Sequence, residues 1–470
     1  MLESSVVYKI FASAGSFLMK LINGSWFVNF FLKEDETSCA QSEGSIFYKI
    51  YNLLRNMLCS IFSALKLDRI FAGSIYKNVF IWASLTAVMA PILPTKLMIV
   101  LAAAGFGSLI LALGCERERK LRFSPVNKFI YIYAAIYFVS IITSVDMKGS
   151  LFGGLLTVFF VLFAIVMENA IESKKQVKVL MFVLSGAGVL VSLYGFYQYL
   201  FQSKFGGVWV DTDMFASISF RVYSTLENPN VLGEYFLLVI PLAVAGFFIS
   251  KNWLLKLYYM GCTGVMMICL VLTYSRGCYI GILVAAAIFL VLLDRRFIIL
   301  GVLGLFALPF VLPETIIQRF MSIGNMNDSS TSYRVYIWLG TINMLKDYWL
   351  SGIGPGQSAY NKVYPFYGYN GISAPHAHNT FLQIMCDTGV AGIITFVLII
   401  YQYFKNLFIT YLKEKDFEAK VLTISAMSSV MAFMVQSMFD YTFYNYRVML
   451  MFWIFIGLGA VFTQYSSLKD

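Results

Sequence analysis

Long apolar runs separated by short polar connections make up most of the chain from residue 77 to residue 470. A helix needs about 20 apolar residues to cross the hydrocarbon core of a bilayer, and many of these runs approach that length. The pattern therefore predicts an all-α integral membrane protein, a polytopic bundle of about twelve transmembrane helices. The predicted spans are 78–94, 97–114, 127–144, 151–169, 178–200, 232–250, 255–273, 279–293, 297–313, 379–404, 421–438 and 447–464.

Residues 1–76 have a different pattern. In residues 3–22 and again in 45–71, apolar residues recur near helical spacing with basic residues between them. Amphipathic helices of this kind lie on a membrane surface rather than crossing it. The start of the chain does not show the apolar centre and small-residue cleavage site of a signal peptide. We therefore expect a cytoplasmic-side interfacial extension over residues 1–76 and a transmembrane domain over residues 77–470.

Basic residues are concentrated in alternate connections between the predicted spans. Because lysine and arginine are retained on the cytoplasmic side of a membrane, these connections predict one orientation, with both termini in the cytoplasm. The other connections then face outward: residues 201–231, the tight turn 274–277, a large helical loop over residues 314–378, and residues 439–446. The basic residues of the five cytoplasmic connections are Arg117, Arg119, Lys120 and Arg122; Lys174, Lys175 and Lys178; Lys251 and Lys256; Arg295 and Arg296; and Lys405, Lys413, Lys415 and Lys420.

Composition agrees with a membrane protein: 59% of the residues are hydrophobic and 13% are charged, and the mean hydropathy is +0.74. These values exclude a soluble domain of this length. The formal net charge of +10 follows from the basic connections, so it does not indicate nucleic-acid binding. The seven cysteines form neither a CxxC pair nor a Cys/His spacing, so we expect no disulfide framework.

Four arginines stand out in the outward-facing connections, namely Arg221, Arg276, Arg334 and Arg447. Arg276 lies between two apolar runs that only a few residues separate, so it must lie near the lipid headgroups. An ionisable residue at that depth usually faces a partner or a polar cavity, although snorkelling explains a single arginine equally well. Guanidinium groups bind phosphate oxygens through paired hydrogen bonds and stay charged at neutral pH. The group favours a lipid-linked phosphate or pyrophosphate as ligand.

The chain has two histidines, His376 and His378, and both precede the span that begins near Asn379. A histidine in an interfacial loop is often an ordinary surface residue. The concentration of both histidines at the mouth of one span nevertheless favours proton transfer, for which imidazole is suited near neutral pH. We therefore predict that His378 is a general base. A metal site is less favoured, because the sequence offers no outer carboxylate at ligand spacing.

Two features of the outer loop have alternative interpretations. The pattern over residues 332–348 predicts an amphipathic helix that carries Arg334 and Trp338 near one side. A cluster of tyrosines that includes Tyr360 follows. Interfacial anchoring is the usual role of such tyrosines, and stacking against sugar rings is the alternative.

Two polar turns are also candidates. The turn Glu227-Asn228-Pro229-Asn230 is expected to start a helix, with Asn230 or Asn228 as its cap. A contact of this turn with Arg221 or with a sugar hydroxyl is the alternative. The run Gly352–Gly356 lacks the Lys-Ser/Thr of a nucleotide-binding loop, so we expect a sharp turn there.

Five motifs follow one another in the chain: Arg221 to Asn230; Thr273-Tyr274-Ser275-Arg276-Gly277; Ser332-Tyr333-Arg334 with Trp338; Gly352-Ile353-Gly354-Pro355-Gly356; and His376-Ala377-His378-Asn379-Thr380-Phe381-Leu382-Gln383 with Gly389 and Gly392. Each is weak alone, but their order and their expected topology are specific. Together they resemble the O-antigen ligase and polymerase family over about residues 200–395. The first 76 residues depart from the usual pattern of that family.

The resemblance implies an integral-membrane glycosyltransferase of the GT-C type in the bacterial plasma (inner) membrane. Such enzymes move a glycan from a polyprenyl pyrophosphate carrier to an acceptor hydroxyl, a glycan or glycolipid, on the outer face of the bilayer. They use no metal, nucleotide or other cofactor. By motif, Arg276 and Arg334 would handle the pyrophosphate and His378 would act near the acceptor. The further candidates for substrate binding are Arg221, Asn230, Trp338, Tyr360, His376 and Asn379.

Two other functions stay open at this point. A polymerase of the same family would join repeat units on the carrier, and the sequence does not separate it from a ligase. A transporter or flippase for a lipid-linked saccharide would need charged residues in the middle of several spans. The predicted spans are almost free of them, and the polar groups gather at one face. That distribution favours an enzyme.

Overall fold

The computed structural model describes residues 46–202, 205, 218, 220–311, 313–322, 324 and 328–470. The chain forms two compact units, Met1–Leu53 and Leu54–Asp470. In the first unit only residues 46–53 are described, and they begin a helix. The amphipathic segment expected at residues 3–22 lies outside the described residues.

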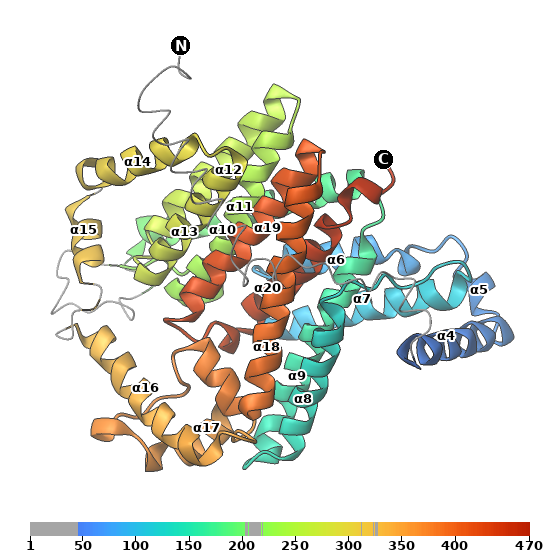
Figure 1. The fold of residues 1–470 in the computed structure, drawn as a ribbon, viewed down its shortest axis with the longest axis horizontal. Helices are drawn as coiled ribbons and strands as arrows, with labels where there is room; N and C mark the ends of the chain where they lie inside the picture. Colours follow the sequence, from blue (N-terminus) through green and yellow to red (C-terminus); the bar gives the residue numbers. More distant parts are fainter. Residues whose placement is uncertain are drawn as a thin grey trace, which may run out of the picture. The chain divides into compact units, whose positions relative to one another are not determined.

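Helices account for the regular structure in the described part of the chain (Figure 1). The α-helices are α4 (Ile46–Ala64), α5 (Leu67–Ile70), α6 (Val79–Met89), α7 (Thr95–Cys115), α8 (Asn127–Ile142), α9 (Met147–Ala170), α10 (Lys174–Leu200), α11 (Pro229–Ile249), α12 (Trp253–Val271), α13 (Arg276–Leu293), α14 (Phe297–Val311), α15 (Glu314–Met321), α16 (Ser329–Tyr348), α17 (Gln357–Val363), α18 (Thr380–Lys413), α19 (Phe417–Ser437) and α20 (Tyr446–Phe462). Short 3-10 helices are η2 (Ile75–Lys77), η4 (Ser224–Leu226), η5 (Tyr364–Phe366), η6 (Tyr369–Gly371), η7 (Thr442–Tyr444) and η8 (Tyr465–Ser467).

Each of the twelve predicted spans coincides with a helix. Among the described residues, eight helices are long and apolar enough to cross a membrane: α7, α9, α10, α11, α12, α13, α18 and α19. The helices α6, α8, α14 and α20 are shorter. The prediction of a polytopic helical membrane protein is confirmed, whereas the count of twelve spans stays a prediction.

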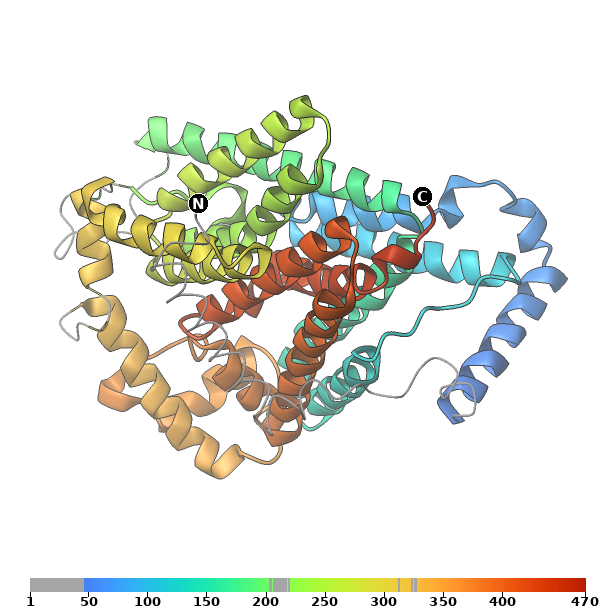
Figure 2. The same cartoon turned by 45° about the horizontal axis from the view of Figure 1, so that its top comes forward.

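Helices α11 and α19 form the centre of the second unit, where 83% and 78% of their most apolar windows are buried. They pack on each other and on α13, and the three lie together in both views (Figures 1 and 2). Gly281 permits the close approach of α13, because a Cβ atom there would lie 2.8 Å from the Ala432 carbonyl oxygen of α19. The ends of these three helices hold much of the site described below.

The outer loop folds into helices α15, α16 and α17 followed by η5 and η6. The predicted amphipathic helix is present as α16, and it buries Ile337, Met344 and Leu345 against a small apolar core of its own. Ile342 of the same helix is exposed.

The glycine-rich turn after α16 is sharp, as predicted, and it attaches the loop to the bundle. Gly352, Gly354 and Gly356 all have positive φ angles, which glycine adopts without steric cost. Between them, the Ile353 N–H donates to the Cys386 carbonyl at 2.6 Å and the Ile353 carbonyl accepts from the Val145 N–H at 3.0 Å. The outer loop is therefore bound to α18 and to the α8–α9 connection.

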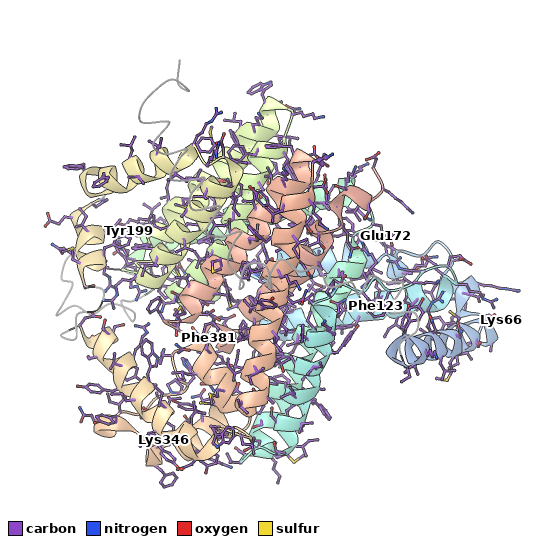
Figure 3. The ribbon with its side chains drawn as sticks, in the orientation of Figure 1. Lys66, Phe123, Glu172, Tyr199, Lys346 and Phe381 are labelled. Atoms are coloured by element: carbon purple, nitrogen blue, oxygen red, sulfur yellow. The ribbon has the colours of Figure 1, made fainter. Side chains whose placement is uncertain are left out.

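Carboxylates are buried inside three of the membrane helices, at Glu168, Glu234 and Asp387. Glu234 and Asp387 lie near the starts of α11 and α18, and Glu168 lies near the end of α9. All three are therefore close to helix ends rather than at the centre of a span. Figure 3 shows Lys346 of the outer loop and Glu172, which follows α9, on opposite sides of the unit.

Candidate functional site

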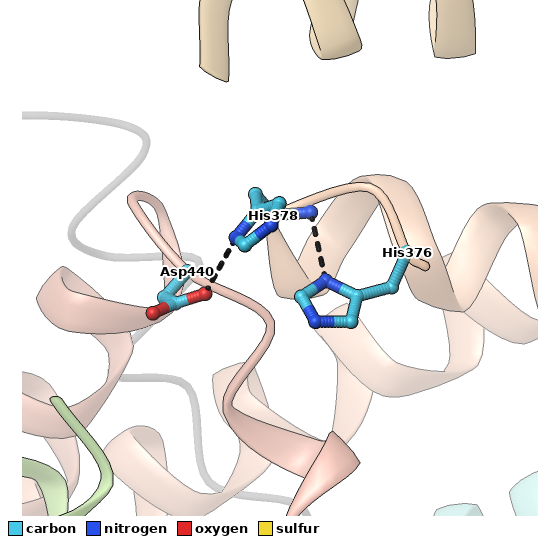
Figure 4. Close-up of side chains that lie close together, drawn as sticks. All are labelled: His376, His378 and Asp440. Atoms are coloured by element: carbon cyan, nitrogen blue, oxygen red, sulfur yellow. Dashed lines mark hydrogen bonds and ion pairs between the residues drawn. The ribbon is translucent and has the colours of Figure 1, made fainter. Parts of the chain in front are cut away.

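Asp440 is the centre of the candidate site, in the short connection between α19 and η7. Its side chain is 5% exposed. One carboxylate oxygen, Oδ1, lies 3.1 Å from His378 Nδ1 (Figure 4). The other, Oδ2, accepts from Asn230 Nδ2 at 2.8 Å and lies 4.0 Å from Arg334 Nη2. Asp440 thus brings together three residues that the sequence had nominated separately.

Sequence reasoning did not single out Asp440 itself. It lies 62 residues from His378 and 210 residues from Asn230, so no local motif joins it to them. The available signal was a carboxylate directly at the end of an apolar run, in the outward-facing connection 439–446. A charged residue at that depth calls for a partner, and the sequence did not show which one.

His378 has an unusual backbone that its neighbours hold in place. Its φ angle is +46°, a left-handed conformation that few residues other than glycine adopt. The His378 N–H donates to His376 Nδ1 at 3.3 Å, and its carbonyl accepts from Trp338 Nε1 at 3.2 Å. The His376 ring stacks on Tyr444 with centroids 5.2 Å apart. Backbone and side chain of His378 are therefore all held, which fixes the direction of its imidazole.

The protonation states of His378 and Asp440 follow from their surroundings. Burial acts to raise the pKa of Asp440, but the hydrogen bond from His378 and the positive charges of His378 and Arg334 outweigh it and lower the pKa well below its usual range. An ionised carboxylate only accepts hydrogen bonds, so Nδ1 of His378 carries the proton that points to Asp440. The Nε2 atom of neutral His378 is then left with a lone pair.

His376 has a different role from His378. Burial, with a smaller contribution from the charge of His378, lowers the pKa of His376 to about 3. The ring is therefore neutral near pH 7, and its Nδ1 lone pair is already used by the His378 N–H. The structure makes His376 a support for the backbone of His378.

The residues after His378 position the segment that carries Asp440. Asn379 caps α18 by accepting from the Leu382 N–H at 3.0 Å, and its Nδ2 donates to the Met438 carbonyl at 2.8 Å. Thr380 Oγ1 donates to the Asp440 carbonyl at 3.0 Å. Both ends of the Asn379 side chain are thus engaged in these structural bonds, which accounts for this residue without a substrate contact.

Arg334 reaches the site from the second turn of α16. Its Nη1 donates to the carbonyl and the hydroxyl of Ser330, one turn earlier. Its Nε is buried and makes no hydrogen bond to any described residue. The guanidinium is therefore tethered on one side and loosely paired with Asp440 on the other, which leaves it able to bind a further anion.

Arg276, the first residue of α13, lies at the start of the same helix α16. Its Nη2 lies 2.5 Å from Asp328 Oδ2, and its Nη1 donates to the Ser322 carbonyl at 3.2 Å and hydroxyl at 2.9 Å. Asp328 caps α16. Since Asp328 and Arg334 are six positions apart, about 9 Å along a helix axis, α16 sets the spacing between the two arginines.

Arg221 also belongs to this group. Its Nη2 donates to Asn230 Oδ1 at 3.0 Å, and its Nε donates to the Thr273 carbonyl at 2.9 Å. Burial and the positive charge of Arg319, a buried residue of α15, lower the pKa of Arg221 to about 9. Of the two candidate caps, Asn228 caps α11 by accepting from the Asn230 N–H. The alternative role of Asn230, a contact with Arg221, is present, and Asn230 links that arginine to Asp440. Sequence reasoning did not single out Arg319.

Two of the nominated residues lie elsewhere or have another role. Arg447 pairs with Glu227 at 3.5 Å and donates to the Thr225 carbonyl at 2.8 Å. Tyr360 is fully buried, stacks on Tyr364 and shares a 2.8 Å hydrogen bond with Thr341. Tyr360 therefore packs the core of the outer loop, and a sugar would not reach its ring.

The site also contains a donor set that a metal ion could use. One ligand atom each from His376, His378 and Asp440 lie within 4.8 Å of one another, and zinc accepts two imidazoles and a carboxylate. The sequence-based reason against a metal, the lack of a suitable carboxylate, was therefore wrong. Against a cation, both oxygens of Asp440 are already engaged and Arg334 adds a positive charge 4.0 Å away. The absence of a metal stays a prediction.

Comparison with known proteins adds an independent finding. Residues 261–397 match the sequence model of a protein family described as O-antigen ligase. Proteins from Rickettsia conorii and Rickettsia felis, both provisionally named polysaccharide ligases, are each 28% identical to this chain over 113 residues. The similarity covers 23% of this chain and 26% of each relative, so the chain matches about a quarter of their length. The matched segment 261–397 carries Arg276, Arg334 and His378, and its similarity to O-antigen ligases agrees with the resemblance that its motifs had indicated.

Proposed function

We propose that the protein transfers a glycan from a polyprenyl pyrophosphate carrier to an acceptor hydroxyl at the outer face of the bacterial plasma membrane. The observation that carries the proposal is the position of Asp440, which orients His378 beside Arg334 and, through Asn230, Arg221. A base held next to several guanidinium groups suits a reaction in which a hydroxyl loses a proton and a diphosphate leaves.

His378 supplies the base in this proposal. Its Nδ1–H donates to Asp440, so Nε2 accepts the proton of the acceptor hydroxyl as that oxygen attacks the anomeric carbon. The imidazolium that forms is stabilised by the negative charge of Asp440 at 3.1 Å. No group other than His378 has to move a proton in this step.

The arginines act on the leaving group. As the new carbon–oxygen bond forms, the bond between the anomeric carbon and the pyrophosphate oxygen breaks, and the electron pair leaves with the pyrophosphate. Arg334 and Arg276, spaced by α16, offer guanidinium donors for the negative charge that develops there. A single displacement of this kind inverts the configuration at the anomeric carbon.

A ligase is favoured over a polymerase by the description of the matching family and by the names of the relatives. An in-frame deletion distinguishes the two in cells. Loss of a ligase leaves long glycan chains attached to the lipid carrier, whereas loss of a polymerase leaves single carrier-linked units. Single units in the deletion strain would contradict transfer of a finished chain.

The direct test uses purified protein with a lipid-pyrophosphate glycan and candidate acceptors, with a chelator present throughout. We expect transfer in the presence of the chelator and its loss in His378→Ala. Normal turnover by His378→Ala would remove His378 as the base. Loss of turnover in the chelator, restored by a divalent ion, would instead favour an ion at His376, His378 and Asp440.

A further inference from the structure

Helix α4 presents three different faces in the part that belongs to the larger unit, residues 54–64. One face docks on the protein, one is polar and exposed, and one is apolar and exposed. Residues three and four positions apart share a face of a helix, so each face can be assigned from the spacing of its members. The membrane role proposed below for α4 is independent of the transfer reaction.

The docked face lies against the last turn of α7. The Cys59 thiol donates to the Leu113 carbonyl at 3.3 Å, and the Phe62 ring packs on Gly114, whose hydrogen leaves room for it. The Arg55 Nε donates to the Arg119 carbonyl at 3.0 Å, just beyond the same helix end. These contacts fix the rotation of α4 about its own axis.

The exposed apolar face is formed by Leu54, Met57 and Ile61, followed by Leu65 directly after the helix. These side chains are 54%, 55%, 46% and 62% exposed. Their spacing of three, four and four positions keeps them on one stripe. Large apolar side chains in such a row are not left in water without a partner.

The exposed polar face lies beside this stripe and includes Asn56 and Ser60. Each directly precedes a member of the apolar stripe, Met57 or Ile61, and a step of one residue turns a helix by about 100°. Within residues 54–64 the exposed polar positions and the exposed apolar positions are thus on different sides of the helix. An amphipathic helix lying at a bilayer surface has this arrangement.

The position of α4 relative to the expected membrane boundary agrees with a lipid contact. Helix α7 is long and apolar enough to cross the membrane, so its last turn, on which α4 docks, lies where the hydrocarbon core ends. Tyr76 and Trp82, whose rings stack, line a groove of about 410 Å³ together with Phe71 and residues of α7, and the lining is almost wholly apolar. Tyrosine and tryptophan favour the headgroup region. Lys66 (Figure 3) and Arg69 follow α4 in the chain, are both exposed and suit anionic headgroups.

We propose that the stripe Leu54, Met57, Ile61 and Leu65 inserts into the lipid leaflet at the α7 C-terminal end of the bundle, while Asn56 and Ser60 face water. The occupant of this face is the bilayer. The sequence pattern over residues 45–71 predicted an interfacial segment, and the docked face now determines which side chains enter the lipid.

Spin labels on the full-length protein in phospholipid nanodiscs test this assignment. Single cysteines replace Met57, Ile61, Asn56 or Ser60 in a background from which the seven native cysteines have been removed. At Met57→Cys and Ile61→Cys we expect frequent collisions with oxygen and few with a water-soluble nickel chelate. The matched controls Asn56→Cys and Ser60→Cys should show the reverse, since they differ by a single position.

Two results would overturn the proposal. Equal access of the nickel chelate to all four labels would place the apolar stripe in water. Exclusion of both reagents at Met57→Cys and Ile61→Cys would show that protein, such as a second copy of the chain, covers the stripe. Brominated lipids provide a second measurement: they should quench a fluorophore at Met57→Cys several-fold more than one at Asn56→Cys, and equal quenching would contradict insertion.

Discussion

The carboxylate of Asp440 interacts with several partners that lie far apart in the sequence. His378 and the Tyr441 N–H bind one oxygen, and Asn230 binds the other with Arg334 nearby. The carboxylate therefore fixes the tautomer of His378 and at the same time limits how far Arg334 can move. Removal of its charge should affect the base and the anion site together.

We expect Asp440→Asn to lower the transfer rate by roughly 10²–10⁴-fold, as happens when the carboxylate that orients a catalytic histidine is replaced. The amide has the same shape but no longer stabilises the imidazolium, so the acid limb of the pH–rate profile should move to lower pH. Initial rates between pH 5 and pH 9 measure both effects. An unchanged profile with a reduced rate would indicate that Asp440 has only a structural role.

His376 should be replaceable by a neutral residue that keeps a hydrogen-bond acceptor. In His376→Asn, Oδ1 takes the place of Nδ1 and can still accept from the His378 N–H, whereas His376→Leu cannot. We expect near-normal transfer from the asparagine variant and a loss of roughly tenfold or more from the leucine variant, because an unmet backbone donor costs about 1–3 kcal/mol. Equal loss in both variants would show that the hydrogen-bond acceptor at this position is not what the reaction needs from His376.

The same residue makes a pH-dependent contribution to stability. Burial lowers the pKa of folded His376 to about 3 from the ordinary 6.5, so the folded state favours the neutral ring. The wild-type protein should therefore lose stability as the pH falls from about 6.5 toward about 3, because the unfolded chain binds the proton first. Thermal unfolding across this range should show a smaller loss in His376→Asn.

Substitution of Arg276 tests whether the reaction needs a planar guanidinium at this position. Arg276 bridges Ser322 and Asp328 through two different nitrogens, a geometry that a lysine ammonium does not reproduce. We expect Arg276→Lys to lose roughly 10²–10³-fold in transfer rate, nearly as much as Arg276→Ala. Arg447→Lys is the matched control, since Arg447 pairs with Glu227 and the Thr225 carbonyl rather than with Asp440 or Asp328. Near-normal transfer by Arg276→Lys would count against its phosphate role.

A single residue could be nominated from the sequence where its side chain is of a type that is rare at that depth in the membrane. Arg276, Arg334 and His378 were identified because few charged or titratable residues occur near the ends of the spans. Asp440 was missed, since its partners come from other parts of the chain and only packing brings them to it. Tyr360 was nominated as one of several similar tyrosines, and the sequence could not indicate which of them the fold would bury.

At the scale of elements, the kink in α18 joins the outer loop to the bundle. Gly389 has a φ angle of +67° inside this helix, and its neighbour Val390 donates to the Trp349 carbonyl at 2.8 Å. A side chain at Gly389 would meet the Leu350 backbone. The kink therefore depends on glycine for both its conformation and its close approach.

We expect Gly389→Ala to destabilise the protein by roughly 1–3 kcal/mol, because alanine disfavours a positive φ angle and the contact is with backbone atoms. Thermal unfolding in detergent or nanodiscs measures the change. Gly264→Ala in α12 is the control, since a Cβ atom there meets nothing within 4 Å and a helical alanine is favourable. An equal effect of the two substitutions would mean that the kink does not need glycine.

Elements were predictable to the extent that a membrane constrains them. Backbone groups in lipid must bond within their own segment, so each long apolar run had to form a helix, and each did. Helix ends were less well predicted: α10 begins at Lys174, where Ser173 and Gln176 form a capping box, and α18 extends to Lys413. The loop helices α15 and α17 have no membrane to enforce them, and their positions came from the structure.

At the scale of the whole molecule, the two ends of the bundle have different chemistry. At the end predicted to face the cytoplasm, some basic residues pair with carboxylates, as in Lys178–Glu418 at 2.8 Å and Arg119–Glu172 at 2.7 Å. At the other end the arginines gather around Asp440 and Asp328 beside a histidine. The first end is rich in lysine as well as arginine, whereas the second brings several guanidinium groups together beside His378, an arrangement that suits an anionic substrate.

This asymmetry predicts the orientation of the protein in the membrane. Because lysine and arginine in short connections are retained inside, the α18–α19 connection should be cytoplasmic and the outer loop external. In a cysteine-free background, an impermeant maleimide should label Phe366→Cys, which is 85% exposed in the outer loop, on intact cells. It should label Lys415→Cys, exposed between α18 and α19, only after the membrane is opened. The opposite pattern would place His378 and its arginines in the cytoplasm, where an acceptor assembled outside the cell could not reach them.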